Sequence, residues 1–407
     1  MHGEATTKQK KIYIIGGGAS GFFAAINSAI NFPDYSVVIL EKTNNLLSKV
    51  KISGGGRCNV TNNTFENSEL IKNYPRGSKE LRQVFSEFSV ADTIKWFGDR
   101  GVKLKTEPDG RIFPESNLSE TITDLFLWEA KKRNIEIKLN EEVLSIKKSE
   151  KIILTTNKNK FTADKVICSV GGFHQPRNYE FLKILGHTIT EIVPSLFTLN
   201  IKKDNIINLM GLSVKNAKIK IANTKFETEG AILITHWGFS GPAVLKLSAF
   251  AAYEFAKSKY NLKISIGWVN DLNMEEIAQQ LKSFASEKLL IANSPKFEIP
   301  KRLWEYLLVK SGINLNKRWG EASKKEINNL AKNLSDDVYT VLGKTTFKEE
   351  FVTAGGVSLK EINFKTMESK IFPGLYFCGE VLNIDGITGG FNFQNAWSTA
   401  WVAAKNV

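Results

Sequence analysis

Glycines near the start of the chain have the spacing of a phosphate-binding turn. Gly16, Gly18 and Gly21 follow a short apolar strand and lead into a helix. Gly16 permits a tight turn, Gly18 lets the backbone approach a pyrophosphate, and Gly21 lets the helix pack close to the strand. The N–H groups of Ala19 and Ser20, at the positive end of that helix, would then hold the phosphates. The spacing therefore favours a dinucleotide site over a purely structural glycine turn.

A carboxylate follows these glycines at the distance that the motif requires. A second apolar run, 36–40, ends in Glu41, about twenty residues after Gly21. A carboxylate in this place holds a ribose diol and repels a 2′-phosphate, so an NADP adenosine is not expected here. Lys42 comes next and belongs to the same predicted site.

A second glycine-rich segment follows soon after this acid. Three consecutive glycines at 54–56 precede Arg57, Cys58 and Asn59. Such a segment provides a flexible backbone cradle with polar groups for the sugar, phosphates or ring edge of a cofactor. We predict contacts from Gly55, Gly56, Arg57, Cys58 and Asn59, with a structural loop as the alternative. For the Cys58 thiol itself we favour a structural role over a reactive one.

More glycine turns lie much later in the chain. A buried strand at 164–170 ends in paired glycines, and another at 375–378 ends in a glycine and an acid. A last glycine turn then opens a helix at 393–404. A cofactor that contacts turns so far apart is longer than one strand–helix–strand unit can hold, and FAD is such a cofactor. The N–H groups at the start of the last helix suit the N1–C2=O edge of its ring, where negative charge develops on reduction. A plain structural helix is the alternative. The predicted contacts are Gly171, Gly172, Gly379, Glu380, Asp385, Gly389, Gly390, Phe391 and Asn392.

The elements that position these turns indicate an α/β fold. We predict helices at 81–101 and 119–134, a hairpin at 103–114, mostly helical structure at 274–342 and a strand at 351–357. The FAD-binding domain would comprise residues 1–190 and 348–407. Between its two parts we expect a β-rich domain at 191–270 and a helical domain at 271–347.

Composition limits the class of protein. The net charge of +13 comes from scattered lysines without a basic tail, so we interpret it as a lysine-rich surface and expect no dedicated nucleic-acid arm. The three cysteines lie far apart without a CxxC pair, which indicates a reducing compartment and no metal site. The first residues are polar, and no apolar run reaches the eighteen or so residues of a membrane span. We therefore expect a cytoplasmic protein that does not bind membranes.

Two motifs together are similar to a known family. GGGRCN at 54–59 and DGITGG at 385–390 resemble the bacterial NAD(P)/FAD-dependent oxidoreductases that include aminoacetone oxidase and a flavoprotein of bile-acid dehydroxylation. The resemblance implies a glutathione-reductase-like FAD-binding Rossmann domain, interrupted by a β-rich and a helical domain. Phe391 stands where tyrosine is usual and Asn395 where an aromatic is usual. The resemblance therefore does not fix the substrate.

Catalytic residues are harder to identify than cofactor contacts. His236 is a candidate for proton transfer because histidine titrates near neutrality, but Ser240 and Pro242 explain the same motif as a helix start. His174 is a similar candidate. No second strand-borne glycine fingerprint is present, so NAD(P)H would visit the flavin transiently, or oxygen would be the redox partner.

The leading interpretation is an FAD-dependent oxidoreductase acting on a small organic substrate. A tRNA-modifying flavoprotein and a non-catalytic FAD-binding protein are the alternatives. The oligomeric state is open.

Overall fold

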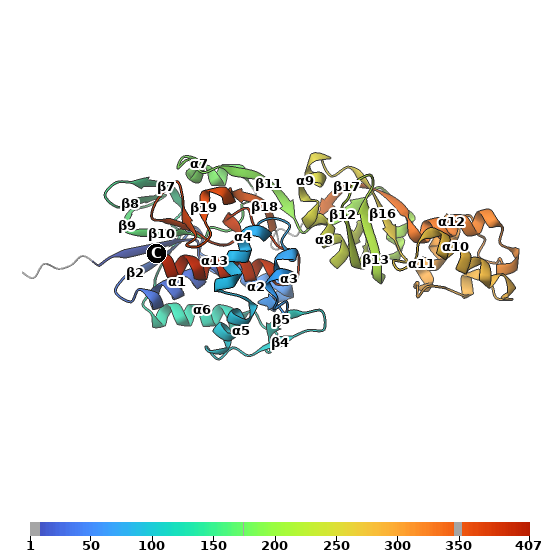
Figure 1. The fold of residues 1–407 in the computed structure, drawn as a ribbon, viewed down its shortest axis with the longest axis horizontal. Coiled ribbons are helices and arrows are strands. Elements are labelled where there is room, and N and C mark those ends of the chain that lie inside the picture. The colour runs from blue at the N-terminus through green and yellow to red at the C-terminus, as the bar shows by residue number, and fades with distance from the viewer. Residues whose placement is uncertain (1–8, 174, 346–351) are drawn as a thin grey trace, which may run out of the picture. The chain divides into compact units, whose positions relative to one another are not determined.

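The computed structural model describes residues 9–173, 175–345 and 352–407 (Figure 1). Contacts divide the chain into two compact units. Unit 1 comprises residues 1–195 and 348–407, and unit 2 comprises residues 196–347. Among the described residues, no helix combines the length and apolar character needed to cross a bilayer.

A seven-stranded sheet forms the centre of unit 1. Its order is β19-β20-β21-β10-β1-β2-β6. The five strands from β21 to β6 pair in parallel, whereas the pairs β19–β20 and β20–β21 are antiparallel. Strand β1 lies between β10 and β2, so the chain crosses over on both of its sides. The strands are β1 Lys11–Ile15, β2 Ser36–Glu41, β6 Glu136–Leu139, β10 Lys165–Cys168, β19 Ile362–Asn363, β20 Glu368–Ser369 and β21 Leu375–Phe377.

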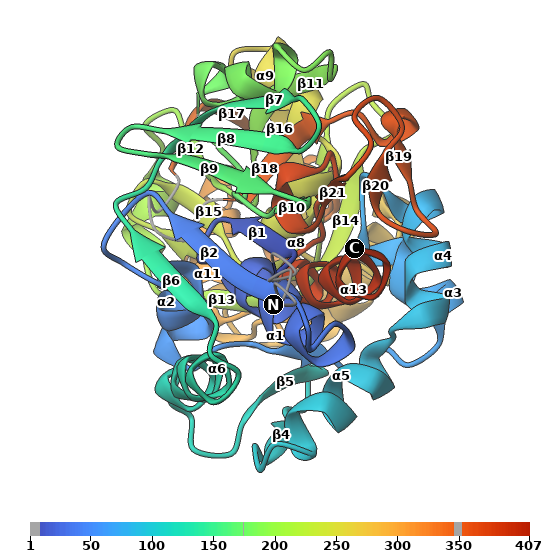
Figure 2. The same ribbon diagram turned by 90° about the vertical axis from the view of Figure 1, so that its left-hand side faces the viewer.

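Different kinds of elements pack on the two faces of this sheet (Figure 2). Helices α1 (Ala19–Asn31), α13 (Phe391–Asn406) and α6 (Glu120–Lys132) lie on one face. The meander of β7 (Val143–Lys148), β8 (Ile152–Thr156) and β9 (Lys160–Ala163) lies on the other. Helix α1 is apolar through most of its length and packs along α13, with the Phe23 and Trp397 ring centroids 5.4 Å apart.

Shorter elements complete unit 1. The helix expected at 81–101 is two helices, because Ser89 and Asp92 form a capping box that starts a new helix, with Ser89 N donating to Asp92 Oδ2 at 2.7 Å. The antiparallel pair β11 and β18 contributes strands on either side of the inserted residues. These elements are α2 Ser48–Gly56, β3 Thr61–Asn62, α3 Asn67–Leu70, α4 Ser78–Glu87, α5 Val90–Gly98, β4 Leu104–Thr106, β5 Arg111–Pro114, α7 Glu180–Lys183, β11 Ile189–Ser195 and β18 Val352–Val357.

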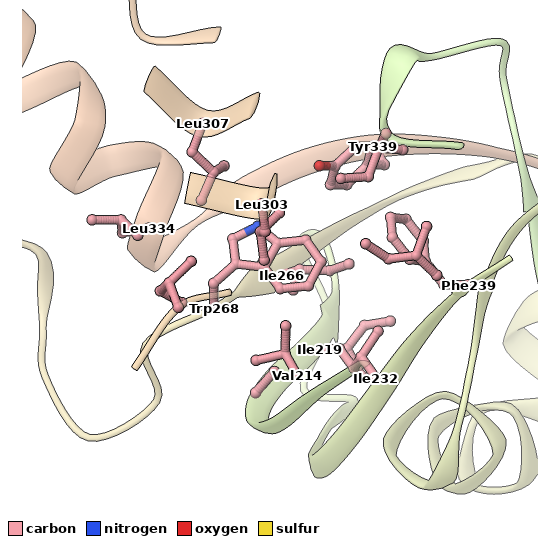
Figure 3. Close-up of a cluster of buried hydrophobic side chains, with 14 of the residues drawn as sticks. Val214, Ile219, Ile232, Phe239, Ile266, Trp268, Leu303, Leu307, Leu334 and Tyr339 are labelled. Carbon is pink, nitrogen blue, oxygen red and sulfur yellow. The ribbon is translucent and has the colours of Figure 1, made fainter. Parts of the chain in front are cut away.

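Unit 2 is a closed barrel with helices packed against it. The barrel order is β12-β15-β14-β13-β16-β17. Trp268, Leu303 and Leu334 belong to one apolar cluster that joins the barrel to its helices (Figure 3). The elements are β12 Thr198–Ile201, β13 Ser213–Ile221, β14 Glu227–Thr235, β15 Gly238–Ser240, α8 Pro242–Phe250, α9 Ala252–Lys257, β16 Leu262–Gly267, α10 Met274–Ser283, α11 Lys301–Lys310, α12 Lys324–Ser335 and β17 Asp337–Thr345.

The end of the stretch expected to be helical is instead a barrel strand. In β17, Asp337, Tyr339 and Val341 are buried while Val338 and Leu342 are exposed, which is the two-residue period of a strand. The predicted β-rich and helical domains both lie largely in unit 2, and the apolar cluster takes residues from both. Whether the two parts fold separately stays a prediction.

Candidate functional site

The first glycine turn joins β1 to α1. A β-carbon on Gly21 would lie 1.9 Å from the Gly16 carbonyl oxygen, so Gly21 is required by packing. A β-carbon on Gly18 would have no described atom within 4 Å. Gly18 precedes Ala19 and Ser20, and the first N–H groups of a helix lack intrahelical acceptors. Open space beside free N–H donors fits a bound pyrophosphate.

Glu41 ties the end of β2 to this turn. Its Oε2 accepts from Gly17 N at 2.8 Å, and its Oε1 accepts from the N and Oγ1 of Thr43, each at 2.9 Å. A carboxylate accepts about four hydrogen bonds, so these contacts leave capacity for a ribose hydroxyl. The carboxylate is held in a fixed orientation by the loop that follows β1 and by the loop that follows β2.

A hollow opens at the carboxyl ends of β1 and β2. Its lining includes Gly16, Glu41, Val170 and Phe173, and the Lys42 ammonium lies 4.9 Å from the Phe173 ring centroid. In open α/β sheets, nucleotides bind at this edge, where the strand order reverses. The hollow therefore matches the place of an adenosine beside the phosphate turn.

The second glycine segment forms the kinked end of α2. Gly54, Gly55 and Gly56 have φ of 59°, 71° and 82°, a left-handed run that excludes a continuous helix. A β-carbon on Gly55 or Gly56 would meet no described atom within 4 Å. These two glycines therefore line open space, as a cofactor cradle requires.

The side chains that follow these glycines contact protein. The Arg57 guanidinium stacks over Phe113 with its carbon 3.9 Å from the ring centroid, and its Nη1 donates to Glu107 Oε1 at 2.5 Å. Cys58 is fully buried, and burial raises its pKa to about 12 despite the hydrogen bond from Ser53. Its thiol stays protonated at neutral pH, which supports a structural role.

Asn59 connects the second glycine segment to the last glycine turn. With its amide oriented to satisfy both ends, its nitrogen donates to Thr61 O at 2.9 Å and its oxygen accepts from Gly390 N at 2.9 Å. The Gly390 N–H is thus bonded within the protein. The sequence did not reveal this contact, because the two residues are more than 300 positions apart.

Gly379 and Glu380 bring the first and last parts of the chain together. Gly379 N donates to Thr399 Oγ1 at 2.9 Å, and a β-carbon on Gly379 would lie 2.6 Å from Ser20 Oγ. Glu380 accepts from Lys49 Nζ at 2.6 Å and from Thr353 N at 2.9 Å. The ends of the predicted site are therefore adjacent in unit 1.

The paired glycines after β10 lie beside this group. A β-carbon on Gly172 would lie 2.5 Å from Thr353 Oγ1 and 2.7 Å from Glu380 Oε1. A β-carbon on Gly171 would meet no described atom within 4 Å. Gly172 thus serves packing, and Gly171 borders open space.

Side chains of the last glycine turn bond to protein. The Asp385 carboxylate is fully buried, pairs with Arg76 through both oxygens, and accepts from Ser195 Oγ at 2.8 Å. Burial raises the pKa of Asp385, and Arg76 opposes that rise. Asn392 exchanges two hydrogen bonds with the Gly386 backbone, at 2.8 and 2.9 Å. These side chains shape the turn and leave the first backbone N–H groups of α13 as its donors toward a cofactor.

Two residues that the sequence analysis did not name also hold this turn. Asn62 Nδ2 donates to Gly389 O at 3.0 Å, and Tyr74 OH donates to Phe391 O at 2.7 Å. A β-carbon on Gly390 would lie only 2.4 Å from Thr61 O. The start of α13 is therefore fixed against the segment that follows the second glycine cradle.

Both histidine candidates lie outside the described part of unit 1. His236 is exposed in the turn between β14 and β15 of unit 2, with its ring centroid 3.9 Å from that of Trp237. His174 lies outside the described residues. In the described part of the chain, no group of three or more His, Cys, Asp or Glu side chains is arranged to hold a metal ion.

The fold is of the Rossmann type, and its open glycine turns fit a dinucleotide cofactor. A family model described as "HI0933-like protein Rossmann domain" matches residues 10–406. The chain belongs to this family, as the two sequence motifs predicted.

Two relatives match nearly the whole chain. A 3-dehydro-bile acid delta(4,6)-reductase of Clostridium scindens is 29% identical over 97% of this chain and 98% of its own. A ribosomal RNA dihydrouridine synthase of Escherichia coli is 28% identical over 97% of both chains. Together with the family match, these relatives support an FAD-dependent oxidoreductase.

Solved structures share the fold. A 3-ketosteroid delta1-dehydrogenase of Sterolibacterium denitrificans has a TM-score of 0.51 at 11% identity, covering 97% of this chain and 98% of that one. A 3-ketosteroid-delta4-(5alpha)-dehydrogenase of Rhodococcus jostii has a TM-score of 0.50 at 11% identity, covering 98% of each chain. At this identity the likeness concerns architecture, and it agrees with the predicted FAD-binding fold.

Proposed function

We propose that this protein is an FAD-dependent reductase that saturates a carbon–carbon double bond conjugated to a carbonyl group. The open cradle at Gly18, Gly55, Gly56 and Gly171, with Glu41 at its adenosine end, is the observation that carries the cofactor assignment. The names of the two relatives support the reaction. A 3-oxo Δ4,6 bile acid and a uracil ring both present a double bond next to a carbonyl.

The electron donor proposed here is a reduced nicotinamide dinucleotide. When bound, FAD supplies two-electron chemistry, which links the oxidation of this donor to the reduction of the substrate. Overall, one hydride from the nicotinamide and one proton add across the double bond. The sequence has no second dinucleotide fingerprint, so the donor and the substrate would use the same open face in turn.

The residues of the chain bind and orient in this scheme. The N–H groups of Ala19 and Ser20 would hold the pyrophosphate, Glu41 would hold the ribose, and the first N–H groups of α13 would face the ring end. Backbone donors fixed before the reaction stabilise developing negative charge without reorganisation. The ion pair between buried Asp385 and partly buried Arg76 keeps the start of α13 in place for this role.

Anaerobic reduction of the purified holoprotein tests the proposal. We expect NADH or NADPH to bleach the flavin absorbance, and a conjugated enone to restore it. A saturated ketone of the same skeleton is the control and should leave the flavin reduced. If the reduced flavin ignores the enone and is reoxidised only when oxygen is admitted, the protein acts as an oxidase. Bound flavin that no donor reduces would favour the non-catalytic alternative.

A uridine in RNA is the second candidate substrate. Residues 196–347 contain 22 Lys and Arg against 14 Asp and Glu, so unit 2 holds +8 of the net charge of +13. Positive charge favours a phosphate backbone, with an affinity that falls steeply as salt rises. Incubation with ribosomal RNA and NADPH, followed by nucleoside analysis, distinguishes the candidates. Dihydrouridine formation identifies RNA as the substrate, and enone turnover without it identifies a small molecule.

A further inference from the structure

Asn395 contains a buried polar atom that the fold leaves unpaired. The residue lies in the second turn of α13 and is 1% exposed. Among the described residues, its Oδ1 has no hydrogen-bond partner. Buried polar side-chain atoms are usually paired, and leaving one unpaired costs the desolvation free energy of the group. This atom therefore needs an explanation.

The position of Asn395 places it beside the proposed cofactor. Asn395 and Thr399 are one turn apart on the same face of α13, and Thr399 Oγ1 donates to Asn395 O at 2.5 Å. Thr399 also accepts from Gly379 N, and Gly379 borders Ser20 in the phosphate turn. Asn395 thus lies between the Gly379 contact and the start of the helix.

A second unpaired atom borders the same segment. Thr353 is fully buried, and its Oγ1 has no partner among the described residues. Its backbone N–H donates to Glu380, the residue that follows Gly379. Two unpaired polar atoms, on residues of the two segments that bond to Gly379 and Glu380, indicate a polar ligand near these residues.

We infer that Asn395 Oδ1 is a cofactor contact that accepts a hydrogen bond from a hydroxyl group of the ribityl chain. This inference rests on the FAD binding used in the proposed function. With the pyrophosphate at the start of α1 and the ring at the start of α13, the segment of FAD between them is the ribityl chain. Its hydroxyl groups are the donors that an amide oxygen requires.

Loss of Asn395 Oδ1 should have opposite effects on the stability of the apoprotein and of the FAD-bound protein. Asn395→Leu keeps most of the side-chain volume and removes the polar atoms. The apoprotein should melt at the same temperature as the wild type or higher, because an unsatisfied group is gone. FAD affinity, measured by quenching of its fluorescence, should fall about tenfold, and the rise in melting temperature caused by FAD should shrink. Asn395→Ser retains a hydroxyl acceptor and should bind FAD more tightly than Asn395→Leu.

Ser28 provides a matched control. It lies in α1, is fully buried, and its Oγ is also without a partner in the described part of the chain. Ser28→Ala should leave FAD affinity unchanged. Unchanged affinity in Asn395→Leu, or an equal loss of stability in its apo and holo forms, would overturn the inference. If Asn395→Leu does not fold, wild-type FAD affinity in Asn395→Ser would also overturn the inference. A wild-type protein that binds no FAD would refute the cofactor assignment itself, whatever the behaviour of the Asn395 variants.

Discussion

Glycines at the candidate site serve two separate purposes. At Gly21 and Gly390 a β-carbon would lie 1.9 and 2.4 Å from backbone oxygens, so these glycines allow close packing. At Gly18 and Gly171 the same direction is open. The sequence motif predicted different roles for Gly18 and Gly21, and the structure gives them an open and a crowded environment respectively.

Gly18→Val tests this distinction. Gly18 has φ of −90°, which valine adopts without strain, so the apoprotein should fold with close to wild-type stability. The side chain would fill the pyrophosphate place, and the protein should purify colourless. Gly21→Val is the contrasting variant and should fail to accumulate as folded protein. A yellow Gly18→Val protein would contradict the assignment of the phosphate turn.

Glu41→Ala should weaken FAD binding without abolishing it. Loss of charge-assisted hydrogen bonds, worth about 1.5 to 3 kcal/mol, corresponds to about a ten- to hundredfold weaker dissociation constant. Titration of apoprotein with FAD measures the change. Thr43→Val is the control, since it removes one donor to Glu41 and leaves the carboxylate. Equal affinity in Glu41→Ala and wild type would place the ribose elsewhere.

His187 should make the stability of unit 1 depend on pH. It is 3% exposed and lies between Glu361 and Ser369, with each ring nitrogen 3.0 Å from an oxygen. Burial lowers its pKa below the ordinary 6.5, and Glu361 opposes the shift. Below pH 6.5 the unfolded chain therefore binds a proton that the folded chain does not, and the free energy of unfolding falls as pH falls.

The contribution of His187 to the free energy of unfolding can change by about 1.4 kcal/mol per pH unit. Urea titrations between pH 5 and 7 should show a shallower pH dependence for His187→Gln than for wild type. An identical slope in His187→Gln and wild type would show that the site titrates alike in both states.

At the level of elements, α13 is held by residues that precede it by about 300 positions. Thr61 Oγ1 donates to Gln394 Oε1 at 2.6 Å, and Trp397 Nε1 donates to Val60 O at 2.9 Å. Both acceptors and donors are buried. The residues that follow the second glycine segment and helix α13 are therefore packed together by buried hydrogen bonds.

Asp385→Asn should destabilise this group strongly. Removing one partner of a buried ion pair costs about 3 to 5 kcal/mol, because the remaining charge is uncompensated. Equilibrium unfolding in urea, monitored by tryptophan fluorescence, measures the loss. The double variant Asp385→Leu with Arg76→Met should be less destabilised than Asp385→Asn, since neither charge remains. A single variant as stable as wild type would show that the pair is not what holds the turn.

Local signals predicted most of the elements that carry the site. The strands at β1, β2 and β10 and the helices at α1, α6 and α13 follow from apolar periodicity and glycine placement. Two elements were predicted wrongly. The helical periodicity of 81–101 hid the break at Ser89, where a capping box starts a new helix, and the helical pattern of 274–342 hid β17, which closes the barrel. The pairs Asp385–Arg76, Asn59–Gly390 and Tyr74–Phe391 could not be predicted, because nothing local to either partner specifies the other.

At the level of the whole molecule, unit 2 is inserted between two neighbouring strands. In the β11–β18 pair, Ser195 lies opposite Val352, so the chain leaves and re-enters unit 1 at adjacent positions. Replacing residues 196–351 with an Asn-Gly hairpin turn should therefore give a folded unit 1. We expect this protein to bind FAD, measured by absorbance after gel filtration. An insoluble product would mean that unit 2 is needed for the fold of unit 1.

Helix α13 also determines when the protein can acquire its cofactor during synthesis. Unit 2 is one continuous stretch, whereas α1 packs along a helix that is translated after unit 2 is finished. Domains fold as units while the chain emerges from the ribosome, so unit 2 should mature before unit 1. Stalled nascent chains that end before residue 391 should contain a folded barrel and retain no flavin. Until translation passes that point, Phe23 has its contacts with Phe88 and Trp96 but lacks the one with Trp397, so the side of α1 that packs along α13 stays open to solvent.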